Sequence, residues 1–313
     1  MSVVIILQRM LILFAMMMIG YFCYKKGWIN DDFYGRLSKI VVGVMNPLLI
    51  INGVINKDTS GIGDMIGINL ILVIGYFIVL TVVSYPLVRI LRVKVTEKGL
   101  YQAMFIFSNV GFMGIPVISS LYGEVSTIFV SFYILAYNIL LYTFGLVLVG
   151  KSVPEKEKSS SGFSFKSILN TGVAACVIAI VIFAFRIRVP EFAESFVFYV
   201  GNAAVPCSMM LVGVGLARAD LKKMFSDVRM LVFILIRSVI IPVVIALIMK
   251  YIPVDGELKG ICCLMFAMPI GSIVALVANN AGADDQMCAQ ACALNTLFSV
   301  LTIPIVTAFF ALW

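Results

Sequence analysis

The chain has 313 residues, of which 62% are hydrophobic and only 12% are charged, and its formal net charge is +7. Soluble domains average about 25% charged residues, so this composition excludes a soluble globular protein and indicates an integral membrane protein. The apolar segments are long and continuous rather than alternating in ten-residue strands, which excludes an outer-membrane β-barrel.

Ten apolar segments follow one another along the chain, and most approach the ~20 residues that a transmembrane helix needs. They cover residues 4–24, 37–55, 66–88, 99–121, 125–149, 168–185, 195–217, 230–250, 259–281 and 287–312. The first has no basic leader and no small-residue cleavage motif, which predicts a retained helix rather than a signal peptide. The predicted fold class is an all-α polytopic membrane protein with ten transmembrane helices.

Basic residues predict the orientation of these segments. Most of the 23 Lys and Arg residues lie in loops on one side of the membrane, after the first, third, fifth and seventh segments. Cytoplasmic loops carry such an excess, so both termini are expected outside the cytoplasm of a multi-pass protein in the inner or plasma membrane. Because the positive charge lies in these short loops, it predicts no nucleic-acid partner.

The fourth apolar segment carries polar and helix-breaking residues at its centre: Ser108, Asn109, Gly111, Gly114 and Pro116. Proline removes a backbone donor and clashes with the preceding turn, and glycine adds conformational freedom, so a broken helix is predicted. Open backbone is tolerated at membrane depth only where protein or a polar cavity satisfies it.

The ninth segment repeats this pattern with Pro269, Gly271 and Ser272. Two interrupted hydrophobic segments at matching places in two halves of a chain indicate the binding site of a secondary transporter. The alternative interpretation is a pair of proline kinks in ordinary helices.

A polar linker, residues 151–166, divides the chain into two sets of five segments. Similar short patterns recur about 160 residues apart, which indicates an internal repeat. The pairs are Lys98-Gly99 with Lys259-Gly260, Tyr122-Gly123 with Ala281-Gly282, Asn138 with Asn295, and Pro47 with Pro206. Five is odd, so residues 1–150 and 167–313 are predicted to form a 5+5 inverted repeat.

Three short motifs resemble those of a known family of membrane transporters. Asn46-Pro47-Leu48, Ser108–Pro116 and Met268–Ser272 resemble the auxin efflux carrier family, whose prokaryotic branch includes malate and malonate permeases and whose plant branch exports auxin. The resemblance implies a fold shared with bile-acid sodium symporters and sodium–proton antiporters. In that fold, helices 1, 2, 6 and 7 form a scaffold that is usually dimeric. Helices 3–5 and 8–10 move, and broken helices 4 and 9 cross.

At a helix break, freed N–H groups favour an anion and freed carbonyls favour a cation. The predicted substrate-binding residues at the breaks are Ser108, Asn109, Gly111, Pro116, Pro269, Gly271 and Ser272. The resemblance implies that Asn109 lies near the substrate. The alternative is that Asn109 and Ser108 only satisfy broken backbone.

Four further polar residues inside predicted spans complete the candidate set: Asn46, Asn138, Asn295 and Arg237. A polar group facing lipid without a partner is costly, so these side chains are expected inside the bundle. Each has a structural alternative: a kink cap for Asn46, and hydrogen bonding between helices for Asn138 and Asn295. For Arg237 the alternatives are carbonyl contacts that support the broken helices, attraction of a substrate carboxylate, and snorkelling.

The predicted function is secondary transport of a small organic anion, such as malate, malonate or an auxin-like acid, by an elevator-type movement. No Walker-type loop is visible, so a gradient of Na⁺ or H⁺ is the expected energy source. Asp284 and Asp285 could serve a coupling ion, or form an ordinary polar turn.

The alternative functions are a membrane-embedded ligand sensor, a Na⁺- or H⁺-coupled symporter of another solute, and an intramembrane enzyme. The absence of histidine counts against the enzyme and against a metal cofactor. The expected partners are the substrate, membrane lipid and a second copy in a homodimer.

Overall fold

The computed structural model describes residues 3–56, 63–153, 171–218 and 225–310, so most of the predicted linker 151–166 lies outside the described residues. Within these ranges the regular elements are helices. The first half comprises α1 (Val3–Lys25), α2 (Asp31–Ile40), η1 (Val41–Met45), α3 (Asn46–Asn52), α4 (Gly63–Ile90), α5 (Lys98–Ile106), α6 (Gly114–Tyr122), η2 (Glu124–Ser126), α7 (Thr127–Leu140), η3 (Leu141–Gly145) and α8 (Leu146–Gly150). The second comprises α10 (Thr171–Ala184), α11 (Glu191–Asn202), α12 (Ala204–Arg218), α14 (Val228–Leu235), η4 (Ile236–Ile240), α15 (Ile241–Tyr251), α16 (Gly256–Ala267), α17 (Ile273–Asn280) and α18 (Asp285–Phe310). The all-helical prediction is confirmed.

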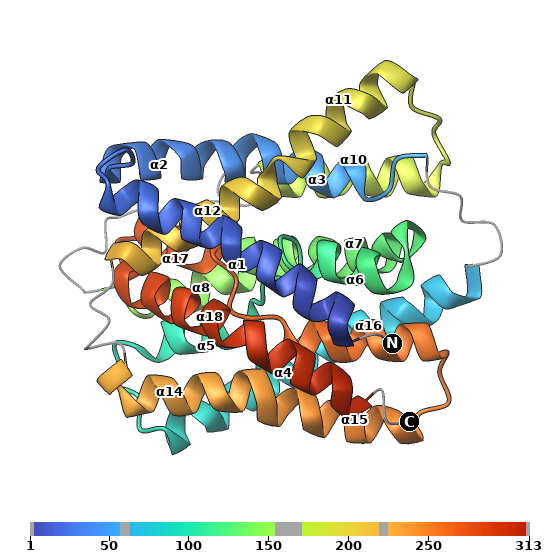
Figure 1. The fold of residues 1–313 in the computed structure, drawn as a ribbon. Coiled ribbons are helices and arrows are strands. Elements are labelled where there is room, and N and C mark those ends of the chain that lie inside the picture. The colour runs from blue at the N-terminus through green and yellow to red at the C-terminus, as the bar shows by residue number, and fades with distance from the viewer. Residues whose placement is uncertain (1–2, 57–62, 154–170, 219–224, 311–313) are drawn as a thin grey trace.

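Six helical stretches of the described chain are long and apolar enough to cross a membrane. They are Asp31–Asn52, Gly63–Ile90, Thr127–Gly150, Glu191–Arg218, Val228–Tyr251 and Asp285–Phe309. Four further predicted spans coincide with α1, with the pair α5 and α6, with α10, and with the pair α16 and α17. Most helices lie along a common direction, and the start of α1 and the end of α18 are at the same end of the molecule (Figure 1).

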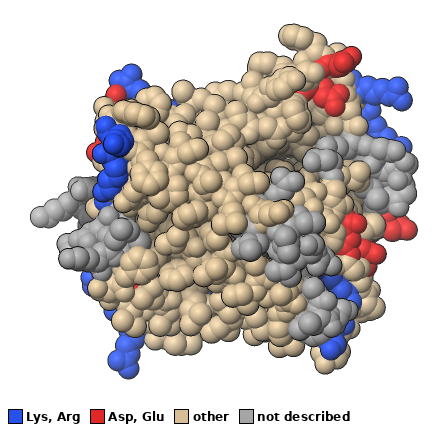
Figure 2. Space-filling view, in the orientation of Figure 1, with Lys and Arg blue, Asp and Glu red and all other residues tan. Residues whose placement is uncertain are grey.

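Charged side chains gather at two opposite ends of the molecule in the view of Figure 2, with a broad uncharged band between them. Large apolar side chains remain exposed on the described surface, such as Ile71, Ile74 and Ile78 on α4. An extensive exposed apolar surface of this kind is expected where lipid takes the place of water.

Three of the long helices contain a five-residue π-helical segment near their middle: η1, η3 and η4. In each, a backbone N–H reaches back five residues instead of four, as from Asn46 to the carbonyl of Val41 and from Ile241 to that of Ile236. Such segments accommodate one extra residue in a turn and occur often at functional sites.

Helices α1 and α12 pack against each other at unusually close range. A Cβ atom on Gly213 would lie 1.8 Å from the carbonyl oxygen of Met17, and one on Gly20 would lie 2.0 Å from that of Met210. Two glycines on facing surfaces therefore allow backbone-to-backbone contact, the small-residue packing common between membrane helices.

Candidate functional site

Two helices are interrupted at the centre of the molecule. The first interruption separates the end of α5 at Ile106 from the start of α6 at Gly114, and the second separates the end of α16 at Ala267 from the start of α17 at Ile273. Both coincide with the breaks predicted from proline and glycine.

The two breaks pair with each other through their backbones. Ser108 and Ile270 form an isolated antiparallel β-bridge. The flanking hydrogen bonds run from the Asn109 N–H to the Pro269 carbonyl at 2.7 Å and from the Gly271 N–H to the Phe107 carbonyl at 2.9 Å. Groups that lose their intrahelical partners thus find new partners on the other break, as a low-dielectric surrounding requires.

Glycine is needed in the second break because neighbouring groups leave no room for a side chain. A Cβ atom on Gly271 would lie 2.8 Å from the Tyr137 hydroxyl and 3.0 Å from the Phe107 carbonyl oxygen. The pairing of the breaks therefore depends on a residue without a side chain at position 271.

The Ser108 hydroxyl is the centre of a polar chain behind the breaks. It accepts a hydrogen bond from Nη2 of Arg237 and lies 2.5 Å from the Tyr76 hydroxyl. The Tyr76 hydroxyl in turn donates to the Met265 carbonyl at 3.4 Å, which leaves Ser108 as the donor to Tyr76. Charge and hydroxyl dipoles are thus aligned in one direction, which strengthens each bond of the chain.

Arg237 is fully buried and lies against the end of α16. Its Nη1 donates to the Phe266 carbonyl at 2.9 Å, and its guanidinium carbon is 5.8 Å from the centre of the Phe105 ring. A cation at a helix C-terminus is stabilised by the freed carbonyls and the helix dipole. This geometry favours the carbonyl-contact interpretation of Arg237 over snorkelling.

Asn295 holds the second break from α18. Its Oδ1 accepts from the Ile270 N–H at 2.9 Å, and its Nδ2 donates to the Ser238 hydroxyl at 2.5 Å. The Cys292 thiol donates to the Ile270 carbonyl at 3.2 Å. Both backbone groups of Ile270 are therefore bound by side chains of one helix.

A pocket of ≈ 280 Å³ lies directly beside the paired breaks. The residues that line it are Asn46, Ser108, Asn109, Val110, Gly111, Phe112, Ile134, Tyr137, Asn138, Gly271, Ser272 and Ile273. We call it the break pocket. Among its described lining residues none is acidic. The first residue of α17, Ile273, lines it, as does Phe112, two residues before the start of α6.

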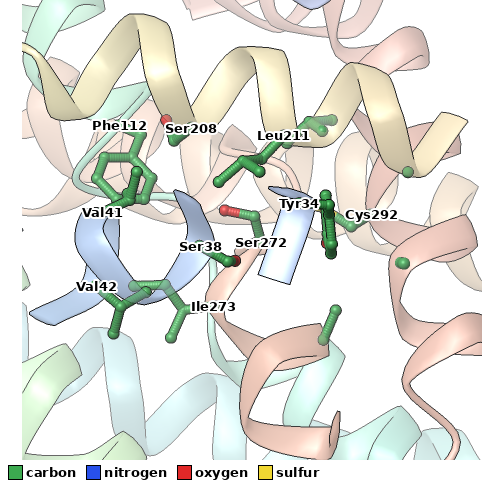
Figure 3. Close-up of a pocket in the computed structure, with 14 residues that line it drawn as sticks. Tyr34, Ser38, Val41, Val42, Phe112, Ser208, Leu211, Ser272, Ile273 and Cys292 are labelled. Atoms are coloured by element: carbon green, nitrogen blue, oxygen red, sulfur yellow. The ribbon is translucent and has the colours of Figure 1, made fainter. Parts of the chain in front are cut away.

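A second pocket of ≈ 450 Å³ adjoins the break pocket and shares Phe112, Ser272 and Ile273 with it. Figure 3 shows α12 with Ser208 and Leu211 on one side, and Ser38, Val41 and Val42 of α2 and η1 on another. Apart from Tyr34, Cys292 and three serines, its lining is apolar. We call it the outer pocket.

Two buried side-chain atoms on the break pocket have no hydrogen-bond partner: Nδ2 of Asn109 and Oδ1 of Asn138. The side chains of both residues are buried, with 4% and 1% of the residue exposed. Buried polar groups are nearly always paired, so an unpaired donor and an unpaired acceptor on one cavity are a notable exception.

Seven of the predicted site residues line the break pocket together: Asn46, Ser108, Asn109, Gly111, Asn138, Gly271 and Ser272. Pro269 and Asn295 lie at the paired backbones, Pro116 lies in the first turn of α6, and Arg237 lies behind Ser108. Their role in substrate binding stays a prediction.

Asp284 and Asp285, the acidic pair predicted either to serve a coupling ion or to form a polar turn, lie at the start of α18. Asp284 accepts a hydrogen bond from the Met287 N–H at 2.9 Å, as an N-cap does. Asn279 and Asn280 precede this pair in the sequence and add amide groups to it, but their side chains lie outside the described residues. Within the described chain, no three His, Cys, Asp or Glu residues are grouped so that they could hold a metal ion.

The sequence analysis missed two tyrosines of the site. Tyr76 binds Ser108 from α4, and Tyr137 lines the break pocket from α7. The spacing of about 160 residues between Tyr76 and Arg237 was the one signal that could have drawn attention to the first of them, because it equals the repeat spacing.

Long apolar helices around two paired helix breaks define a polytopic membrane protein with a central polar pocket. The chain belongs to the membrane transport protein family, whose model matches residues 5–307, and this confirms the family resemblance inferred from the motifs. An uncharacterized transporter of Methanocaldococcus jannaschii is 23% identical to it over 299 residues, which covers 94% of this chain and 95% of that protein. An uncharacterized transporter of Methanothermobacter thermautotrophicus is 21% identical over 298 residues, with coverage of 95% and 96%.

Proposed function

We propose that the protein is a secondary transporter of a small organic anion and that the break pocket is its substrate site. The observation that carries this proposal is the buried, unpaired Nδ2 donor of Asn109 on a pocket whose described lining contains no acid. The starts of α6 and α17 add positive dipole ends, and the Arg237 cation lies one hydrogen bond behind Ser108.

The size of the pocket favours a small solute. Its empty space is ≈ 280 Å³ even with the open side of the pocket included, which leaves room for a small solute only. A carboxylate such as malate or malonate fits this description, and an auxin-like acid would extend into the outer pocket. Membership in a membrane transport family favours transport over catalysis.

The mechanism that we propose is alternating access by an elevator-type movement of a ten-helix, 5+5 inverted repeat. In this proposal α1–α3 and α10–α12 form the scaffold, where α1 packs on α12 and α3 packs on α10 and α11. The remaining helices move with the paired breaks, since separating the breaks would leave backbone groups unpaired in a low-dielectric surrounding.

We also propose a membrane, an orientation, an oligomeric state and an energy source for the protein. We expect it in the inner or plasma membrane with both termini outside the cytoplasm, as a homodimer through the scaffold, and driven by a gradient of Na⁺ or H⁺. These features rest on the loop charges and on the family resemblance.

The test is counterflow in proteoliposomes with a carboxylate and its neutral amide, in the parent protein and in Arg237→Gln. The carboxylate should exchange and the amide should not, with the difference reduced in the variant. Equal exchange of both in the parent protein would rule out an anion site. A difference that survives Arg237→Gln would assign anion preference to the helix ends and Asn109.

A further inference from the structure

Asn109 and Asn138 place opposite hydrogen-bonding groups on one small cavity. Asn109 offers an unpaired N–H donor from the first break, and Asn138 offers an unpaired carbonyl acceptor from α7. A carboxylate has acceptor oxygens only and would satisfy Asn109 but not Asn138. A ligand that satisfies both residues needs an acceptor and a donor.

The free atom of Asn138 is defined by its other contact. Its Nδ2 donates to the Ile134 carbonyl of the preceding turn at 2.8 Å. Reversing the amide would turn an oxygen toward that carbonyl oxygen and lose the bond, so Oδ1 is the atom left for a ligand.

We propose that the substrate is a hydroxycarboxylate, with its carboxylate accepting from Nδ2 of Asn109 and its hydroxyl donating to Oδ1 of Asn138. This inference rests on the proposed function and narrows its substrate class. A hydroxyl is preferred to an ammonium group as the donor because the buried cation of Arg237 lies one residue behind the pocket wall. Like charges in a low-dielectric site repel strongly.

Asn69 shows that an unpaired amide oxygen alone does not make a site. Its Nδ2 donates to the Phe129 carbonyl at 3.1 Å and its Oδ1 is unpaired, yet it is not among the residues that line the break pocket. What distinguishes Asn138 is its position on a cavity that also holds an unpaired donor. Asn69 is therefore a matched control, with the same chemistry in a different place.

The experiment compares acids that differ by one hydroxyl, malate against succinate and lactate against propionate, as competitors of counterflow in proteoliposomes. In the parent protein the hydroxy acid of at least one pair should compete roughly tenfold better, because the deoxy acid leaves Asn138 unpaired. The difference should disappear in Asn138→Leu and persist in Asn69→Leu, with thermal stability of both variants measured in detergent.

Equal competition by hydroxy and deoxy acids in the parent protein would overturn the inference while leaving anion transport intact, and this comparison needs no variant. A difference that persists in a folded Asn138→Leu would overturn the role of Asn138. If neither kind of acid competes or exchanges, the proposed function fails and the inference fails with it.

Discussion

Tyr76 and Arg237 bind the same hydroxyl, that of Ser108, from two different helices. They also bind neighbouring carbonyls at the end of α16, Tyr76 that of Met265 and Arg237 that of Phe266. Their separation of about 160 residues equals the spacing of the proposed internal repeat. One break is thus held against the end of the other broken helix by two side chains, which the proposed repeat would place at corresponding positions of the two halves.

Arg237→Lys should lower both stability and transport. A lysine keeps the charge but loses the planar fork that reaches Phe266 and Ser108 together, so one buried acceptor loses its partner. We expect a loss of about 1–3 kcal/mol of stability, measured by thermal unfolding in detergent. A lysine variant as stable and active as the parent would show that charge alone suffices.

Asn109→Ala should weaken substrate binding by roughly tenfold with little change in melting temperature. The pairing of the breaks uses the backbone of Asn109, whose N–H donates to Pro269, and its Nδ2 has no partner to lose. Uptake kinetics and thermal unfolding separate the two effects. An unstable variant with unchanged affinity would assign the side chain a structural role.

Asn295→Ala should do the opposite and destabilise the protein by about 1–3 kcal/mol. It leaves the buried N–H of Ile270 and the hydroxyl of Ser238 without their partner. The measurement is again thermal unfolding, with Asn109→Ala as the matched control. Equal melting temperatures for the two variants would contradict this division of roles.

Gly213→Ala should destabilise the contact between α1 and α12 by about 1–3 kcal/mol, because its methyl group would overlap the Met17 carbonyl. Gly75→Ala is the control, since no atom lies within 4 Å of a Cβ at that position of α4. Because alanine has a better helix propensity than glycine, Gly75→Ala should leave stability unchanged or raise it by up to ~1 kcal/mol. Similar melting temperatures for both variants would contradict the close packing.

The proposed orientation predicts which loops can be labelled from each side. A cysteine replacing Lys94, whose side chain is 72% exposed, should react with an impermeant maleimide only after the membrane is opened. A cysteine replacing Arg186, after α10, should react in intact cells. The reverse pattern would invert the orientation and leave the fold unaffected.

Much of the fold could be predicted because composition and chain breakers act locally. Apolar length predicted the long helices, and proline with glycine predicted both breaks between α5 and α6 and between α16 and α17. The cost of facing lipid with an unpaired amide predicted Asn46 and Asn138 inside the bundle, and the helix break predicted Asn109 at the site; all three line the break pocket.

The partners inside the bundle could not be predicted in the same way. Tyr76 is one of many aromatic residues in apolar spans, and only the three-dimensional arrangement brings its hydroxyl to Ser108. Likewise, no compositional pattern distinguishes Asn295, which holds backbone, from Asn138, which leaves an oxygen free. That difference depends on which neighbour each amide meets.

The π-helical segments make the pocket sensitive to the register of the chain as well as to its composition. Each segment inserts one residue into a helix that borders the site: η1 precedes Asn46, η4 contains Arg237 and Ser238, and η3 contains Gly145, which packs on Phe107. Because the wide turn absorbs the extra residue, the helix faces the same way on both sides of it. Tightening that turn to an α-helix without removing a residue would turn everything beyond it by about 100°. A relative with a one-residue gap at any of these three places would therefore keep the facing of both halves of that helix and lose only the wide turn.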